Sequence, residues 1–60
     1  MQQTDDLLTT EQVARWVRMS AATVTRWARA EHIPAIKTPR AWRFRRSAVE
    51  AWLKEREAPV

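Results

Sequence analysis

The 60-residue sequence has no cysteine, no glycine and no tyrosine, and its only histidine is His32. Without cysteine the chain forms no disulfide and offers no thiolate ligand, and one histidine does not make a metal site. No apolar run approaches the roughly 20 residues that a transmembrane helix needs. We therefore expect no metal, no cofactor and no membrane association.

The first residues, "MQQTDDLL", carry acids where a signal peptide would carry cations. This start and the lack of cysteine indicate a protein of the bacterial cytoplasm. We expect one domain over residues 7–56, a flexible N-terminus over residues 1–6 and a tail over residues 57–60.

Tryptophan is plentiful for so short a chain, which contains 4 of them. A domain of this size buries only about 60% of its unfolded surface, so its core must be dense. Each indole can bury on the order of 200 Å², and we place Trp16, Trp27, Trp42 and Trp52 in the core. Base stacking, as in single-strand binders, is the alternative role for these rings.

Positive charge is concentrated in the middle of the chain. The net charge is +4, from 11 cations against 7 acids, and all but two of the cations are arginine. Between Val13 and Ala48 the only acid is Glu31. Arginine suits the bidentate geometry of phosphates and guanine edges, so this distribution favours an anionic partner. A basic protein with no such partner is the alternative, which net charge alone does not exclude.

Two short helices are predicted close together near the N-terminus. Thr9 and Gln12 form a capping box, so the first helix should run over Thr10–Val17. Ser20 is a second N-cap and starts a helix within "AATVTRWARAEH". Two helices joined by a turn of three or four residues make a helix-turn-helix.

A basic hairpin follows Pro34. The segments "PAIKT" and "AWRFR" read as two strands, with Pro39 at the second position of the turn between them. Side chains alternate along a strand, so Trp42 and Phe44 should point to the face that packs on the helices. Arg43 and Arg45 should point to the other face. We expect Ile36 to join the aromatic face and Lys37 to point away. A third helix follows, with Ser47 and Glu50 as a possible capping box.

The second helix and the hairpin supply candidate DNA contacts. Small and hydroxyl-bearing residues at the start of the helix suit close approach to a major groove, and hairpin cations can enter a minor groove. The alternatives are that Ser20 only caps its helix and that the cations only solvate the surface. The helix candidates are Ser20, Ala22, Thr23, Thr25, Arg26 and Arg29, and the hairpin candidates are Lys37, Arg40 and Arg43.

Catalytic machinery is missing from the sequence. A nucleophile, a base and an orienting group cannot be assembled from one histidine, scattered hydroxyls and surface acids. We interpret His32 as a helix-end residue and expect no enzyme.

Five segments in order, "LLTTEQVA", "MSAATVTRW", "IPAIK", "WRF" and "AVEAWL", resemble the excisionase-family, MerR-like winged helix-turn-helix domain over Leu7 to Leu53. The resemblance implies a helix-turn-helix, a two-stranded wing and a closing helix, and it adds Thr38 to the wing candidates. It implies double-stranded DNA as partner and a nucleoid location. It also implies either recombination directionality beside a site-specific integrase, with head-to-tail self-association on repeated sites, or a small transcription regulator. A protein-interaction module that uses the basic face is the more distant alternative.

Two positions depart from that family. It often has glycine in the helix-helix turn and at the wing tip, where this chain has Arg18 and Pro39. A left-handed arginine costs roughly 1–2 kcal/mol, so we expect a different turn at Arg18. Proline should stiffen the wing tip.

Overall fold

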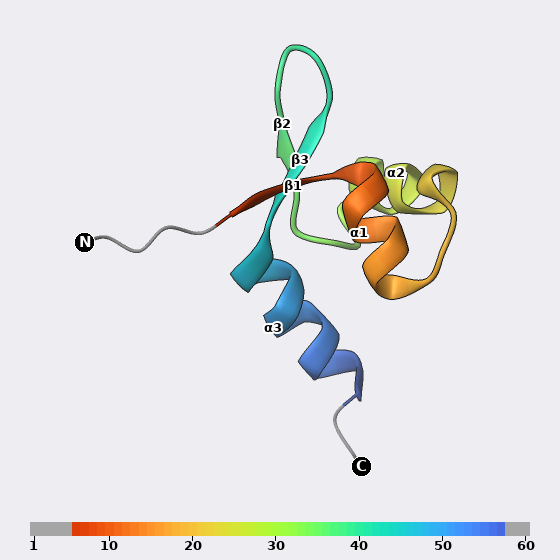
Figure 1. Ribbon diagram of the computed structural model, residues 1–60, viewed down its shortest axis with the longest axis vertical. Helices are drawn as coiled ribbons and strands as arrows, with labels where there is room; N and C mark the ends of the chain where they lie inside the picture. Colours follow the sequence, from red (N-terminus) through yellow and green to blue (C-terminus); the bar gives the residue numbers. More distant parts are fainter. Residues whose placement is uncertain (1–5, 58–60) are drawn as a thin grey trace, which may run out of the picture.

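Three helices and three short strands make up the described part of the chain. The computed structural model describes residues 6–57, so residues 1–5 of the expected flexible N-terminus and residues 58–60 of the tail lie outside the described residues. The order is β1 (Leu7–Thr9), α1 (Thr10–Val17), α2 (Ala21–Arg29), β2 (Ile36–Lys37), β3 (Trp42–Arg45) and α3 (Arg46–Glu57). This mainly helical chain with a hairpin confirms the predicted winged helix-turn-helix. The loop of the hairpin projects away from the helices, and α3 leaves the other end of β3 (Figure 1).

The start of α1 is fixed by the predicted capping box. The Thr9 backbone N–H donates to Gln12 Oε1 at 2.8 Å, and the Gln12 N–H donates to Thr9 Oγ1 at 3.1 Å. Two backbone donors at the helix start are thus satisfied by local side chains. The helix has the predicted bounds, Thr10–Val17.

The turn after α1 corrects the expectation for Arg18, which does adopt the left-handed conformation, with φ 62° and ψ 42°. The Arg18 N–H donates to the Arg15 carbonyl oxygen at 3.3 Å, and the Met19 N–H donates to the Ala14 carbonyl oxygen at 2.9 Å. These two bonds form a Schellman motif, which satisfies the last carbonyls of the helix. These hydrogen bonds offset the steric cost of placing an arginine in the left-handed conformation.

α2 starts at the predicted cap. The Ser20 side chain accepts a hydrogen bond from the Thr23 N–H at 3.1 Å. Only three residues, 18–20, separate the end of α1 from the start of α2, as the helix-turn-helix requires.

The wing belongs to a three-stranded antiparallel sheet with the order β1-β3-β2. The sequence did not reveal β1, because three residues are too few to show alternation. β1 pairs along β3 with Leu8 opposite Phe44. Both side chains are buried, so the strand ties the wing to the start of α1.

The register of the wing corrects the expected faces of its first strand. Ile36 lies opposite Arg43, and Lys37 lies opposite Trp42. Opposed residues of an antiparallel pair share a face, so Lys37 joins the aromatic face and Ile36 joins the arginine face. The tip spans residues 38–41, and this loop length sets the pairing.

α3 begins one residue before the predicted cap. Arg46 is its first residue, directly after β3, so Ser47 lies in the first turn and not at the N-cap. The Arg46 N–H donates to the Asp6 carbonyl oxygen at 3.0 Å, and Arg46 Nε lies 3.4 Å from Asp6 Oδ2. Within residues 6–57, no helix has the length and apolar character needed to cross a membrane.

The core corrects the placement of the tryptophans. Trp16 is 37% exposed, and the other three rings are half-buried against the core. Aliphatic side chains and one phenyl ring fill the interior, and the larger indoles pack around its edge. The buried residues are Leu8, Val13, Ala14, Val24, Ala28, Ile33, Phe44 and Val49.

Candidate nucleic-acid interface

The outer face of α2 brings three of the predicted helix residues together. Val24 and Ala28 are buried in the core, and at 100° per residue the opposite side carries Ala22, Arg26 and Arg29, all exposed. The six predicted helix positions therefore divide into this central strip, the N-cap and two flanking threonines. The strip offers one methyl group and two guanidinium groups to a partner.

Hydroxyl groups at the start of α2 are already organised. Ser20 Oγ donates to Thr23 Oγ1 at 2.9 Å while accepting from the Thr23 N–H. Ser20 therefore has the capping role that its position predicted. The Thr23 hydroxyl accepts in this pair, so its own hydrogen remains for an outside acceptor such as a phosphate oxygen. Thr25 is half-buried on the other flank of the helix.

The two sides of α2 face different neighbours. Trp27 packs on Trp52 of α3, with ring centroids 5.8 Å apart and planes at 51°. The Trp52 Nε1–H donates to the His32 carbonyl oxygen at 2.6 Å. The other side of α2 carries Arg29, which lines a groove shared with the wing. α2 is thus held by α3 along one side and borders the wing along the other.

The tip of the wing is closed by Thr38. Its Oγ1 accepts from the N–H groups of Arg40 at 3.3 Å and Ala41 at 3.0 Å, and it donates to the Ala41 carbonyl oxygen at 2.6 Å. The Thr38 N–H also donates to the Ala41 carbonyl oxygen at 3.0 Å. Pro39 and Arg40 occupy the centre of this turn, as predicted, and both are exposed. The Thr38 hydroxyl is engaged in shaping the tip, which leaves Arg40 as the cation at its end.

The remaining wing cations lie on opposite faces. Lys37 Nζ lies 5.1 Å from the centroid of the Trp42 ring, within the range of a cation–π contact. Arg43 points to the other face, is half-buried, and donates from Nη1 to the Trp42 carbonyl oxygen at 2.9 Å. The structure therefore does not place the predicted wing cations on a single strip.

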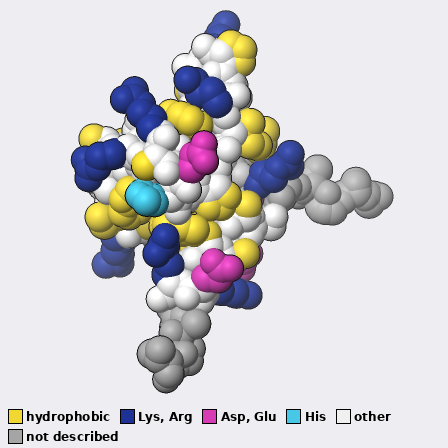
Figure 2. Space-filling model, turned by 180° about the vertical axis from the view of Figure 1, so that it is seen from behind, with side chains coloured by type: hydrophobic (Ala, Val, Ile, Leu, Met, Phe, Trp, Pro, Cys, Tyr) yellow, Lys and Arg dark blue, Asp and Glu magenta, His cyan; other side chains and the backbone are white. Residues whose placement is uncertain are grey.

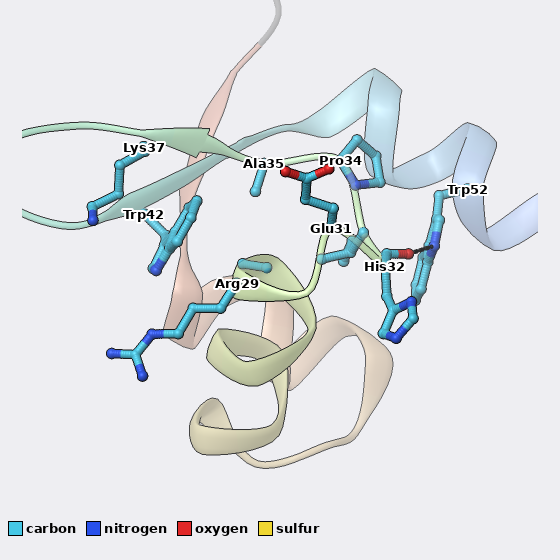
Figure 3. A pocket seen from close by; sticks show the side chains of 10 residues that line it. Arg29, Glu31, His32, Pro34, Ala35, Lys37, Trp42 and Trp52 are labelled. Atoms are coloured by element: carbon cyan, nitrogen blue, oxygen red, sulfur yellow. Dashed lines mark hydrogen bonds between the residues drawn. The ribbon is translucent and has the colours of Figure 1, made fainter.

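A groove of about 670 Å³ lies between the end of α2 and the base of the wing. Figure 3 shows Arg29, Lys37 and Trp42 at one end of it and His32 and Trp52 at the other, with the Glu31 carboxylate between the two ends. Figure 2 shows the whole molecule turned by 180° from the view of Figure 1. On this side, Lys and Arg side chains follow the edge from the wing downward and surround an apolar area beside the histidine. The groove therefore joins cations of α2 and of the wing in one surface.

Sequence reasoning missed the position of Glu31 in this groove. Glu31 has φ 61° and follows α2 as the left-handed residue of a second Schellman motif. Its N–H donates to the Ala28 carbonyl oxygen at 3.1 Å, and the His32 N–H donates to the Trp27 carbonyl oxygen at 2.8 Å. The sequence does show that Glu31 is an isolated acid among cations. That isolation does not predict its left-handed backbone conformation or its place in the groove.

A second hollow of about 330 Å³ adjoins the groove and is lined by Trp27, His32, Trp52 and Arg56. The Arg56 guanidinium lies over the Trp52 ring, with Cζ 4.5 Å from the ring centroid. In the described part of the chain, no three His, Cys, Asp or Glu side chains gather to hold a metal ion.

Comparison with protein-family models gives one match. The model described as "Helix-turn-helix domain" matches residues 7–57. The matched range covers every helix and strand of the structure. The comparisons with curated proteins and with solved structures give no significant match.

Proposed function

The chain belongs to the helix-turn-helix domain family, a DNA-binding family, and on that premise we propose that it recognises specific sequences in double-stranded DNA. In this proposal α2 enters the major groove and the wing reaches the adjacent minor groove. The observation that carries it is the groove that joins Arg29 of α2 to Lys37 of the wing. A helix and a wing that contact neighbouring DNA grooves must have a phosphate strand crossing between them.

The residues of α2 divide into base and phosphate contacts. Ala22 suits a thymine methyl group, and Arg26 suits a base edge or a phosphate. Ser20 and Thr23 lie at the helix N-terminus, where hydroxyls and backbone N–H groups meet phosphates. Thr25 and Arg29 lie nearer the wing and would follow the same strand.

The wing suits a minor groove because its cations lie on both of its faces. A minor groove has a phosphate strand on each side, so Lys37 on one face and Arg43 on the other each meet an anion. Arg40 at the tip supplies a charge that meets a phosphate at the edge of the groove. Thr38 contributes by holding the tip in shape through its hydrogen bonds to Arg40 and Ala41.

A DNA footprint of one short helix and one hairpin is too small for strong specificity by a monomer. We therefore propose head-to-tail assembly on repeated sites, with bending of the DNA, as an excisionase that directs a site-specific integrase toward excision. The support is the resemblance of the segments from Leu7 to Leu53 and the small size of the interface. The protein would act in the bacterial cytoplasm on the nucleoid, and we propose no catalytic activity. A small transcription regulator would use the same interface, and a gene next to a promoter without an integrase would favour that role.

Fluorescence anisotropy with labelled duplexes tests the proposal. A duplex carrying the attachment site of the neighbouring mobile element should bind at least tenfold tighter than a scrambled duplex of equal length, at a stated salt concentration. Equal binding to both duplexes would contradict sequence recognition. If a duplex shifts no amide signals of Thr23, Arg26 or Arg43, DNA binding fails, and a basic face that docks an acidic protein gains support.

A further inference from the structure

The single acid in the basic middle of the chain lies inside the proposed DNA surface. Glu31 lines the same groove as Arg29, Lys37 and Trp42. Its side chain is exposed, and it forms no ion pair with either cation in the described part of the chain. Its charge is therefore not neutralised by a close partner, so an anion entering the groove meets it directly.

The position of Glu31 is fixed by the backbone. The residue sits in the left-handed conformation at the end of α2, held on either side by the two Schellman hydrogen bonds. A carboxylate in a flexible loop could turn away from DNA, whereas this one starts from a constrained Cα in the lining of the groove. In Figure 3 its carboxylate separates the Arg29–Lys37–Trp42 end from the His32–Trp52 end.

We propose that Glu31 limits DNA affinity and confines the crossing phosphate strand to the Arg29–Lys37 end of the groove. This inference rests on the proposed function. Exposed charges act on one another over roughly a Debye length, about 8 Å at physiological ionic strength, and Arg29, Lys37 and Glu31 all line this groove. Two cations attract a phosphate at one end, and Glu31 repels it from the middle.

The test compares Glu31→Gln with Glu50→Gln in the full chain. Both changes remove one exposed carboxylate, but Glu50 lies on α3 and lines neither hollow. At low salt, Glu31→Gln should bind a duplex about threefold tighter than the wild type, and Glu50→Gln should change binding less than 1.5-fold. The difference between the two variants should shrink as salt is raised, because screening weakens a through-space repulsion.

Two further variants separate charge from shape. Glu31→Asp keeps the charge and should bind like the wild type. Glu31→Asn removes the charge with a residue that tolerates the left-handed conformation, so it should bind tighter even if Glu31→Gln is poorly folded. Equal affinity of the Glu31→Gln and Glu50→Gln variants would overturn the inference and leave DNA recognition standing. Absence of duplex binding by the wild type would overturn both.

Discussion

Lys37 and Trp42 face each other across the wing, with the lysine Nζ 5.1 Å from the centroid of the indole ring. The contact places a cation and an apolar ring side by side at the mouth of the groove beside α2. Lys37 is exposed and Trp42 is half-buried. Lys37 therefore presents its charge at the surface, while Trp42 anchors the strand to the core.

This pair predicts that Lys37→Met weakens DNA binding without unfolding the protein. Methionine keeps an apolar stem against Trp42 but removes the charge that would meet a phosphate. We expect affinity to fall about threefold to tenfold and the salt slope to fall by about 1. Anisotropy titrations at several salt concentrations measure both quantities. Lys54→Met, on the exposed face of α3, is the matched control and should leave the slope unchanged.

Trp42 and Arg43 are neighbours on β3 that should respond in opposite ways. Trp42 packs against the core, so Trp42→Ala should destabilise the fold by about 3 kcal/mol, which is a large share of the stability of so small a domain. Arg43→Ala removes a half-buried side chain with one hydrogen bond to the Trp42 carbonyl. It should leave the domain folded and weaken DNA binding. Circular dichroism melts of the two variants decide this, and equal destabilisation would show that the two faces of the wing do not differ in role.

Arg18 offers a test of backbone strain. Glycine adopts φ 62° without the steric penalty of a side chain, although it also gains entropy in the unfolded chain. Arg18→Gly should therefore stabilise the protein by about 0.5 kcal/mol, which raises the melting temperature by roughly 2–4 °C. Arg15→Gly, inside α1, should lower it, because glycine in a helix costs about 1 kcal/mol. If both variants lower the melting temperature, the left-handed arginine carries no strain that glycine relieves.

The caps of α1 and α2 were the most predictable part of the fold because they depend on residues three positions apart, whereas α3 begins at Arg46, before its predicted cap Ser47. Thr9 with Gln12 and Ser20 alone set the starts of α1 and α2, as the sequence indicated. Pairing between distant segments was not predictable in the same way. The partnership of Leu8 with Phe44 joins segments that no local rule connects, and the register of Lys37 follows from a four-residue tip whose hydrogen bonds centre on Thr38.

The candidate site likewise combines features that local sequence rules predict with features that depend on long-range packing. The exposed strip of Ala22, Arg26 and Arg29 follows from helical periodicity around Val24 and Ala28. The groove between α2 and the wing does not, because its shape depends on the left-handed Glu31 and on the face that Lys37 occupies. The depth of the indoles was also set by packing: small aliphatic side chains and Phe44 fill the interior, so Trp16 remains at the surface.

Arg40 should act through phosphates and not through sequence. It lies exposed at the tip, and its backbone N–H is held by Thr38 Oγ1. Arg40→Ala should weaken binding to specific and scrambled duplexes by the same factor and lower the salt slope by about 1. Titrations of both duplexes at several salt concentrations measure this. A loss confined to the specific duplex would instead assign Arg40 to base recognition.

Arg26 should behave in the opposite way, because it stands at the centre of the exposed strip of α2. A guanidinium there reaches a base edge when the helix enters the major groove, and a good bidentate pair is worth about 1–3 kcal/mol of discrimination. Arg26→Ala should therefore cost the specific duplex roughly tenfold or more in affinity and cost the scrambled duplex much less. Arg26→Lys keeps the charge but loses the bidentate fork, so it should restore binding to scrambled DNA and leave discrimination low. If Arg26→Lys recovers full discrimination, the residue acts as a point charge on a phosphate, and the bases are read by Ala22 and the flanking threonines.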